Sequence, residues 1–211
     1  MLTAVLLGFL LGLRHAFDPD HVIAVSTIVA RHRSTWTASW IGVCWGIGHG
    51  ATILAIGFLV IALQVAIPDG FARSIELGIG VLLMLLGILN LLAARPASSL
   101  PSRDAPTRAS LARPAAIGFA HGLAGSAPVA LLAMAAMPGS AAALVYLLVF
   151  ALGTIAGMVA FSVVLVAPFA RLGASAPFSR WVTAGTGMLS LLFGAYLIYE
   201  IGFAAAQRSA V

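Results

Sequence analysis

Apolar stretches long enough to cross a membrane follow one another along almost the whole chain. A helix needs about 20 predominantly apolar residues to span a bilayer. Of the 211 residues, 62% are hydrophobic and only 8% are charged, which is far outside the range of soluble proteins. The sequence therefore predicts an all-α, multi-pass membrane protein with six transmembrane helices, at about residues 2–30, 37–63, 75–94, 115–137, 141–167 and 182–204.

Glycine and histidine recur at a nearly constant spacing in the two halves of the chain. Residues 12–15 (GLRH) resemble residues 118–121 (GFAH), 106 positions later, and offsets of 107 and 105 relate glycines of the other spans. Three spans in each half force the second half to be inverted, and inverted repeats with broken helices are a recurring transporter design. We therefore expect two inverted three-helix repeats, with the first and fourth helices broken at Pro19 and Pro128.

The two repeats are separated by a stretch of different composition. Residues 95–113 are rich in proline, serine and arginine, which predicts a loop. We expect the first repeat to occupy residues 1–94 and the second to occupy residues 114–211.

The arginines predict how the protein is oriented. Eight of them fall in the first, third and fifth connections, whereas Arg73 and Arg208 fall on the other side. The positive-inside rule then makes 95–113 a cytoplasmic loop and places both termini outside the cytoplasm, in the plasma (inner) membrane. This use of the basic residues accounts for the net charge of +5 without a nucleic-acid partner.

Ionisable residues gather in the first span, within the run RHAFDPDH. The chain has only 6 acidic residues and 5 histidines. Such groups are costly at membrane depth and usually mark a substrate or ion pathway. The run therefore predicts a cation site formed by His15, Asp18, Asp20 and His21.

The spacing and the residue types of this run favour a transition metal. His15, Asp18 and His21 are three apart and share one helical face. A break at Pro19 can turn Asp20 toward the same cavity. Mixed imidazole and carboxylate ligands suit Ni²⁺, Co²⁺ and Zn²⁺, whereas Mg²⁺ and Ca²⁺ prefer oxygen and Cu⁺ prefers sulfur.

Two neighbouring residues extend the candidate site. Arg14 is expected to snorkel or to pair with Asp18 or Asp20, with pairing favoured, and repelling cations at the cavity mouth is the alternative. His49 lies between glycines in the second span, which permit close helix approach. It is either a satisfied core histidine or a further metal ligand.

The second repeat supplies the opposite wall of the predicted site. His121 takes the place of His15, and Ser126 takes the place of Asp20. We expect these two residues to act as ligands or to line the ion pathway.

The remaining polar and aromatic residues have simpler predicted roles. His32 lies in a basic loop, where we expect it to be solvated. Glu76 and Glu200 lie near span ends, where anchoring is the simpler account. The tryptophans are expected in interfacial belts, namely Trp36, Trp40, Trp45 and Trp181.

Residues 14–22 (RHAFDPDHV) resemble the signature RHA-x-DADH-I of the nickel–cobalt permease (NiCoT) family. His15, Asp20 and His21 fill its H-x4-D-H core, and Asp18 matches an additional aspartate. Residues 48–50 (GHG) resemble the second motif of the family. The resemblance implies transport of nickel or cobalt, with these residues and His49 as metal ligands.

The chain also departs from that family. Pro19 replaces the signature's alanine, and we do not find the extra first helix or the later acidic motif of typical members. Residues 118–126 (GFAHGLAGS) instead resemble the short urease-accessory (UreH-like) transmembrane proteins. Both groups belong to a wider NicO and LysE-like assemblage, whose members import nickel or cobalt, export metals or carry other substrates.

We expect a secondary carrier for Ni²⁺ or Co²⁺, because the chain has no nucleotide-binding motif such as G-x4-GK[ST]. Uptake is preferred because the 95–113 loop contains no histidine. Efflux and a LysE-like carrier for another substrate are the alternatives, and a membrane metalloenzyme is less favoured. Cys44 alone cannot serve a thiol-relay carrier. We expect no enzymatic activity and no cofactor besides the transported ion. The sequence is compatible with either a monomer or a homo-oligomer.

Overall fold

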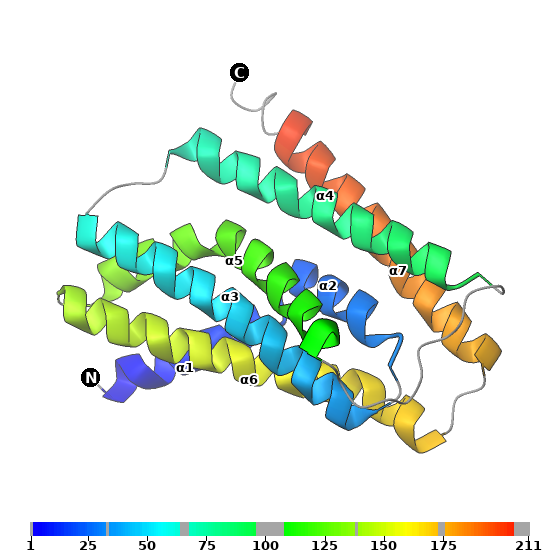
Figure 1. Ribbon diagram of the computed structural model, residues 1–211. Helices are drawn as coiled ribbons and strands as arrows, with labels where there is room; N and C mark the ends of the chain where they lie inside the picture. Colours follow the sequence, from blue (N-terminus) through cyan, green and yellow to red (C-terminus); the bar gives the residue numbers. More distant parts are fainter. Residues whose placement is uncertain are drawn as a thin grey trace.

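Every regular element in the described part of the chain is helical. The computed structural model describes residues 2–32, 34–63, 68–95, 108–137, 139–172 and 176–204. Figure 1 shows the order of the elements. They are α1 (Leu2–His15), α2 (Pro19–Val29), α3 (Thr35–Leu63), α4 (Asp69–Ala93), α5 (Arg108–Ala136), α6 (Ser140–Leu172), α7 (Ala176–Tyr199) and a π-helical end, η1 (Glu200–Ala204).

Four of these helices are long and apolar enough to cross a membrane. Within the described residues they are Thr35–Leu63, Gly70–Ala93, Ser140–Pro168 and Pro177–Phe203. Val5–His15 and Pro19–Val29 are shorter apolar helices, and together they occupy the first predicted span. The chain is therefore an all-helical membrane protein, as the sequence predicted, while the full set of six spans stays a prediction.

The break predicted in the first span is present. Helix α1 ends at His15, and α2 begins at Pro19 after a short turn. Asp18 adopts an extended conformation (φ −61°, ψ 142°) as the residue that caps α2. Proline disfavours helical geometry in the residue before it and suits the first position of a helix, so the Asp18–Pro19 pair ends one helix and starts the next.

The break predicted in the fourth span is wrong, because α5 runs without interruption from Arg108 to Ala136. The residues before the two prolines differ. Asp18 is extended, and its carboxylate accepts from His15 Nδ1 instead of capping α2 with a side-chain hydrogen bond, whereas Ala127 before Pro128 has no polar side chain. A membrane helix tolerates proline when its surroundings satisfy the freed carbonyl group. Helix α5 also begins inside the stretch predicted as a loop, of which 96–107 lie outside the described residues.

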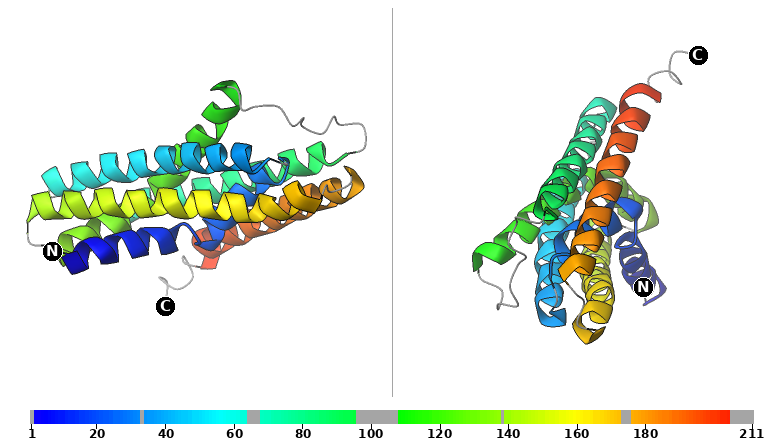
Figure 2. Two further views of the ribbon diagram at one scale, coloured as in Figure 1. Left: turned by 90° about the horizontal axis from the view of Figure 1, so that it is seen from below. Right: turned by 90° about the vertical axis from the view of Figure 1, so that its right-hand side faces the viewer.

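The helices form one tightly packed group and one pair beside it. Helix α3 packs against α5 and α6, and α1 packs against α6. Figure 2 shows α1, α3 and α6 running side by side. Helices α4 and α7 pack mainly on each other and meet the rest through α2 and α5. Helix α2, the second half of the broken first span, thus lies between the group and the pair.

Glycines allow the helices of the tight group to touch backbone to backbone. A methyl group at any of four glycines would overlap a carbonyl oxygen of the facing helix. Such close approaches are typical of membrane helices, which associate through small residues. The four pairs are Gly12 with Phe150, Gly118 with Trp45, Gly48 with Ala115 and Gly153 with Phe9.

Candidate metal site

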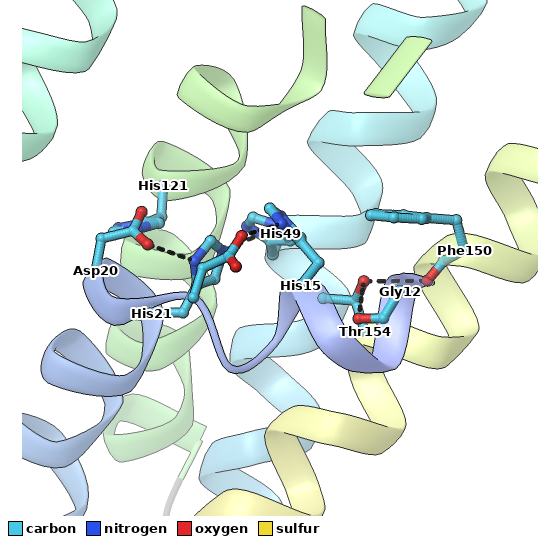
Figure 3. Close-up of polar contacts among 9 residues, drawn as sticks. Gly12, His15, Asp20, His21, His49, His121, Phe150 and Thr154 are labelled. Atoms are coloured by element: carbon cyan, nitrogen blue, oxygen red, sulfur yellow. Dashed lines mark hydrogen bonds and ion pairs between the residues drawn. The ribbon is translucent and has the colours of Figure 1, made fainter. Parts of the chain in front are cut away.

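The turn between α1 and α2 brings four histidines and two aspartates together in the middle of the tight group. His15 is the last residue of α1, whereas Asp20 and His21 lie in the first turn of α2. His49 reaches them from α3 and His121 from α5 (Figure 3). Without the turn, a continuous helix would carry Asp20 away from His15, since residues five apart diverge on a helix.

Three imidazole rings converge through their Nε2 atoms. The Nε2 atom of His49 lies 3.3 Å from that of His15 and 3.4 Å from that of His21. An ion bound tetrahedrally by nitrogen at about 2.0–2.1 Å holds its ligand atoms about 3.3–3.4 Å apart. Two of the three distances therefore match a metal site, and one ligand atom of each ring lies within 4.8 Å of those of the other two. We call these three rings the three-histidine site.

Two carboxylates set the orientation of these rings. The Nδ1 atom of His15 donates to Asp18 Oδ2 at 2.7 Å, and that of His21 donates to Asp20 Oδ1 at 3.1 Å. Because an ionised carboxylate only accepts hydrogen bonds, both rings carry their proton on Nδ1. Their Nε2 lone pairs then face His49. Carboxylate–histidine pairs of this kind commonly orient metal ligands.

A second group lies beside the first and shares His21 with it. His121 Nε2 donates to Asp20 Oδ2 at 2.8 Å, so Asp20 accepts from two histidines. One ligand atom from each of Asp20, His21 and His121 lies within 4.8 Å of the others. We call the four histidines and two aspartates together the polar cluster. It holds two ligand sets that overlap at His21.

Most of these histidines are buried. The exposed fraction is 2% for His21, 0% for His49 and 1% for His121. The Nδ1 atoms of His49 and His121 have no hydrogen-bond partner in the described part of the chain. Buried polar atoms are nearly always paired with protein, water or an ion, so these two atoms mark a site that takes up further polar partners.

Neighbouring residues hold the rings in place. Phe150 packs against His15 with ring centroids 5.3 Å apart, and Trp45 packs against His121 at 5.5 Å. Thr154 Oγ1 donates to the carbonyl oxygen of Gly12 at 3.1 Å and ties the last turn of α1 to α6 (Figure 3).

A comparison with known proteins identifies the family. The chain is 35% identical over 212 residues to the urease accessory protein UreH of Bacillus sp. (strain TB-90), and the alignment covers 96% of this chain and 93% of that protein. The chain belongs to the UreH family.

A second relative is more distant. This UreH-family chain is 27% identical over 177 residues to the chloroplast protein For Growth and Fertility 2 of Arabidopsis thaliana. That alignment covers 77% of this chain and 47% of the plant protein. No family model matches the chain, and no solved structure matches it.

The UreH-family structure brings together most of the residues predicted from the sequence. His15, Asp18, Asp20, His21, His49 and His121 all belong to the polar cluster. The side chain of Ser126 lies outside those described.

The predicted pairing of Arg14 with Asp18 or Asp20 is absent from the described part of the chain, whereas its place in the ion pathway stays a prediction. Its side chain is exposed, and neither aspartate forms an ion pair with it. Both carboxylates are instead held by histidines. Adjacent residues on a helix point about 100° apart, so the exposed Arg14 side chain projects in a different direction from His15, which faces the cluster.

Trp45 is the residue that the sequence reading missed. It was expected at a membrane interface, yet it is fully buried against His121. The internal repeat relates this position to Phe150. Trp45 precedes Phe150 by 105 positions, and Phe150 packs against His15 as Trp45 packs against His121.

Proposed function

We propose that the protein carries a divalent transition-metal cation, nickel or cobalt, across the membrane, and that the ion binds the three-histidine site. The observation that carries this proposal is the convergence of three Nε2 atoms, two of them aimed by carboxylates. The family relationship to a urease accessory protein and the resemblance to the nickel–cobalt permease signature point in the same direction.

The donor atoms favour this class of metal. Imidazole nitrogen suits Ni²⁺, Co²⁺ and Zn²⁺, and the described cluster contains no thiolate that would favour Cu⁺. Three protein nitrogens leave coordination positions for water or for a further ligand, which lets an ion enter and leave. We assign Asp18 and Asp20 to the same metal site, where they hold the Nδ1 protons of His15 and His21.

We further propose a carrier of six spans in two inverted repeats, with both termini outside the cytoplasm. The glycine contacts support this symmetry. Gly12 meets Phe150 and Gly118 meets Trp45, and the equivalent partners differ by 106 and 105 positions. The other two glycine contacts are related by the same offsets. The cluster then lies where the repeats meet, as in other inverted-repeat carriers.

Uptake is the preferred direction, with efflux as the alternative. The loop at 95–113 contains no histidine that could collect metal on the cytoplasmic side. In either direction of transport, the metal ion must replace protons or water at the histidines, and this exchange allows transport to be coupled to a proton gradient.

Metal accumulation in proteoliposomes tests the proposal. Purified protein is reconstituted, Ni²⁺ is supplied outside, and internal metal is measured with Co²⁺ and Zn²⁺ as competitors. A carrier gives time-dependent accumulation above that of protein-free vesicles, and Co²⁺ reduces it. Accumulation equal to that of protein-free vesicles in both orientations of the gradient would show that the protein is not a metal carrier.

A further inference from the structure

A cavity adjoins the polar cluster at Asp20, which is not a member of the three-histidine site. It has a volume of about 300 Å³ and lies between α2, α4, α5 and α7. Most of its wall is apolar, for example Ile79, Phe193 and Leu197, and its two acidic residues are Asp20 and Glu76. A cavity with low-dielectric walls and charges of one sign concentrates the field on a counter-ion. The ion in question is a cation.

Asp20 joins this cavity to the histidines. One carboxylate oxygen accepts from His21 Nδ1, the other accepts from His121 Nε2, and the residue also lines the cavity. His121 is 1% exposed, and its Nδ1 has no partner among the described residues. These three residues offer one carboxylate oxygen and two ring nitrogens, which is a ligand set for the same class of metal as the three-histidine site.

His21 belongs to both ligand sets through different atoms. Its Nε2 faces His49 at 3.4 Å, and its Nδ1 faces Asp20 at 3.1 Å. An ion that moves from one set to the other therefore exchanges one nitrogen of this ring for the other.

We propose that Asp20, His21 and His121 form a second cation position, through which the ion passes between the three-histidine site and the cavity, and that Glu76 draws the ion through that cavity. The proposal rests on the proposed metal transport. It gives Glu76, which the sequence suggested as an anchor, a role in the ion pathway.

The protons balance in this transfer. An ion at the second position replaces the protons that His21 and His121 donate to Asp20. Each ring then carries its proton on its other nitrogen, Nε2 of His21 and Nδ1 of His121, and stays neutral. The carboxylate of Asp20 gains the metal bond in place of two hydrogen bonds.

Two variants separate the second position from the first. His121→Phe keeps a buried ring beside Trp45 and removes both nitrogens. Glu76→Gln removes a charge from an exposed side chain at the cavity, and Glu200→Gln makes the same change at a residue that does not line it. Each purified protein is tested for Co²⁺ and Ni²⁺ binding by calorimetry, for the visible absorption of bound Co²⁺, and for Ni²⁺ flux in proteoliposomes.

We expect His121→Phe to retain binding at the three-histidine site while flux falls about tenfold to 100-fold. Glu76→Gln should lower flux about tenfold at low ionic strength and less at high ionic strength, because salt screens the field of an exposed charge. Glu200→Gln should match the wild type. Wild-type flux in either His121→Phe or Glu76→Gln would overturn the proposal, and if His121→Phe does not fold, Glu76→Gln decides alone.

Failure of the underlying function would look different. If the wild type neither binds nor carries Ni²⁺, or if His49→Ala does both normally, the proposed metal transport is wrong and not only the second position. Wild-type transport with normal flux in the His121 and Glu76 variants would leave the three-histidine site standing and remove the second position.

Discussion

The Nε2 atoms of His15 and His49 lie 3.3 Å apart, although the two residues are 34 positions apart in the sequence and lie on different helices. Asp18 fixes the proton of His15 on the other nitrogen, so the His15 lone pair points at His49. Two such nitrogen atoms approach this closely at low cost when a proton or a metal ion lies between them. This relationship determines what the following changes should do.

Replacing His21 with alanine should abolish nickel transport. The change removes the ring that both ligand sets share, and the loss of affinity should exceed about 100-fold, since even residues that only orient ligands contribute 10–100-fold. Calorimetry measures the nickel affinity, and flux in proteoliposomes measures transport.

His32→Ala is the control and should leave nickel affinity and flux nearly unchanged. His32 lies in the connection after α2, where burial and the neighbouring Arg31 lower its pKa, so the change removes no charge at neutral pH. Normal flux in a folded His21→Ala protein would refute the site assignment.

Replacing Asp18 with asparagine should weaken metal binding without abolishing it. An amide keeps the shape of the carboxylate but no longer demands a proton on His15 Nδ1, so the ring spends part of its time with Nε2 protonated. We expect affinity to fall about 10–100-fold while the stoichiometry is unchanged. A calorimetric titration with Ni²⁺ provides both values. A complete loss of binding would instead make Asp18 a direct ligand.

Metal binding should be lost as the medium is acidified. An unperturbed imidazole titrates near pH ~6.5, and only its neutral form binds metal. Below that pH the protonated rings compete with the ion, and well above it binding should become independent of pH. Titrations in two buffers of different ionisation enthalpy count the protons released. A nickel affinity that does not fall with acidification at any pH at which the protein stays folded would exclude histidine as a ligand, because protons compete for every imidazole ligand.

Replacing Gly118 with alanine should destabilise the fold. The added methyl group would overlap the carbonyl oxygen of Trp45, and such overpacking costs about 1–3 kcal/mol. Gly78→Ala is the matched control, because no atom lies within 4 Å of the position its methyl group would occupy. Thermal unfolding in detergent compares the two. Equal unfolding temperatures would contradict the close contact between α3 and α5.

Cysteines introduced at Ser98 and Ser209 should be labelled from opposite sides of the membrane. The arginine distribution predicts that the 95–113 loop lies in the cytoplasm and the C-terminus outside it. Cys44 is first replaced by serine so that the new thiol is the one labelled. A membrane-impermeant maleimide applied to intact cells should reach only the cysteine at position 209. Labelling of both positions from the same side of the membrane would contradict the six-span topology.

The break in the first span could be predicted because its cause is local. Asp18 and Pro19 are adjacent, and their backbone preferences alone end α1 and start α2. Pro128 has no such neighbour, and its effect depends on how the surrounding helices satisfy one carbonyl group. The same residue type therefore had different outcomes in the two halves.

The members of the cluster could be predicted from residue type, but their pairings could not. Asp20 meets His121 across 101 positions, and this contact depends on how α2 and α5 pack. The orientation of Trp45 was missed for a related reason. Helix α3 is apolar on nearly all sides, so periodicity does not indicate which face is buried.

The turn at residues 16–18 has a mechanical consequence. His15 belongs to one rigid helix and His21 to another, and three residues link the two. The angle between α1 and α2 therefore sets how firmly the two rings hold an ion. A hinge at this turn would loosen that hold while every hydrogen bond inside either helix stays intact, so the proposed carrier would release its ion without melting either helix.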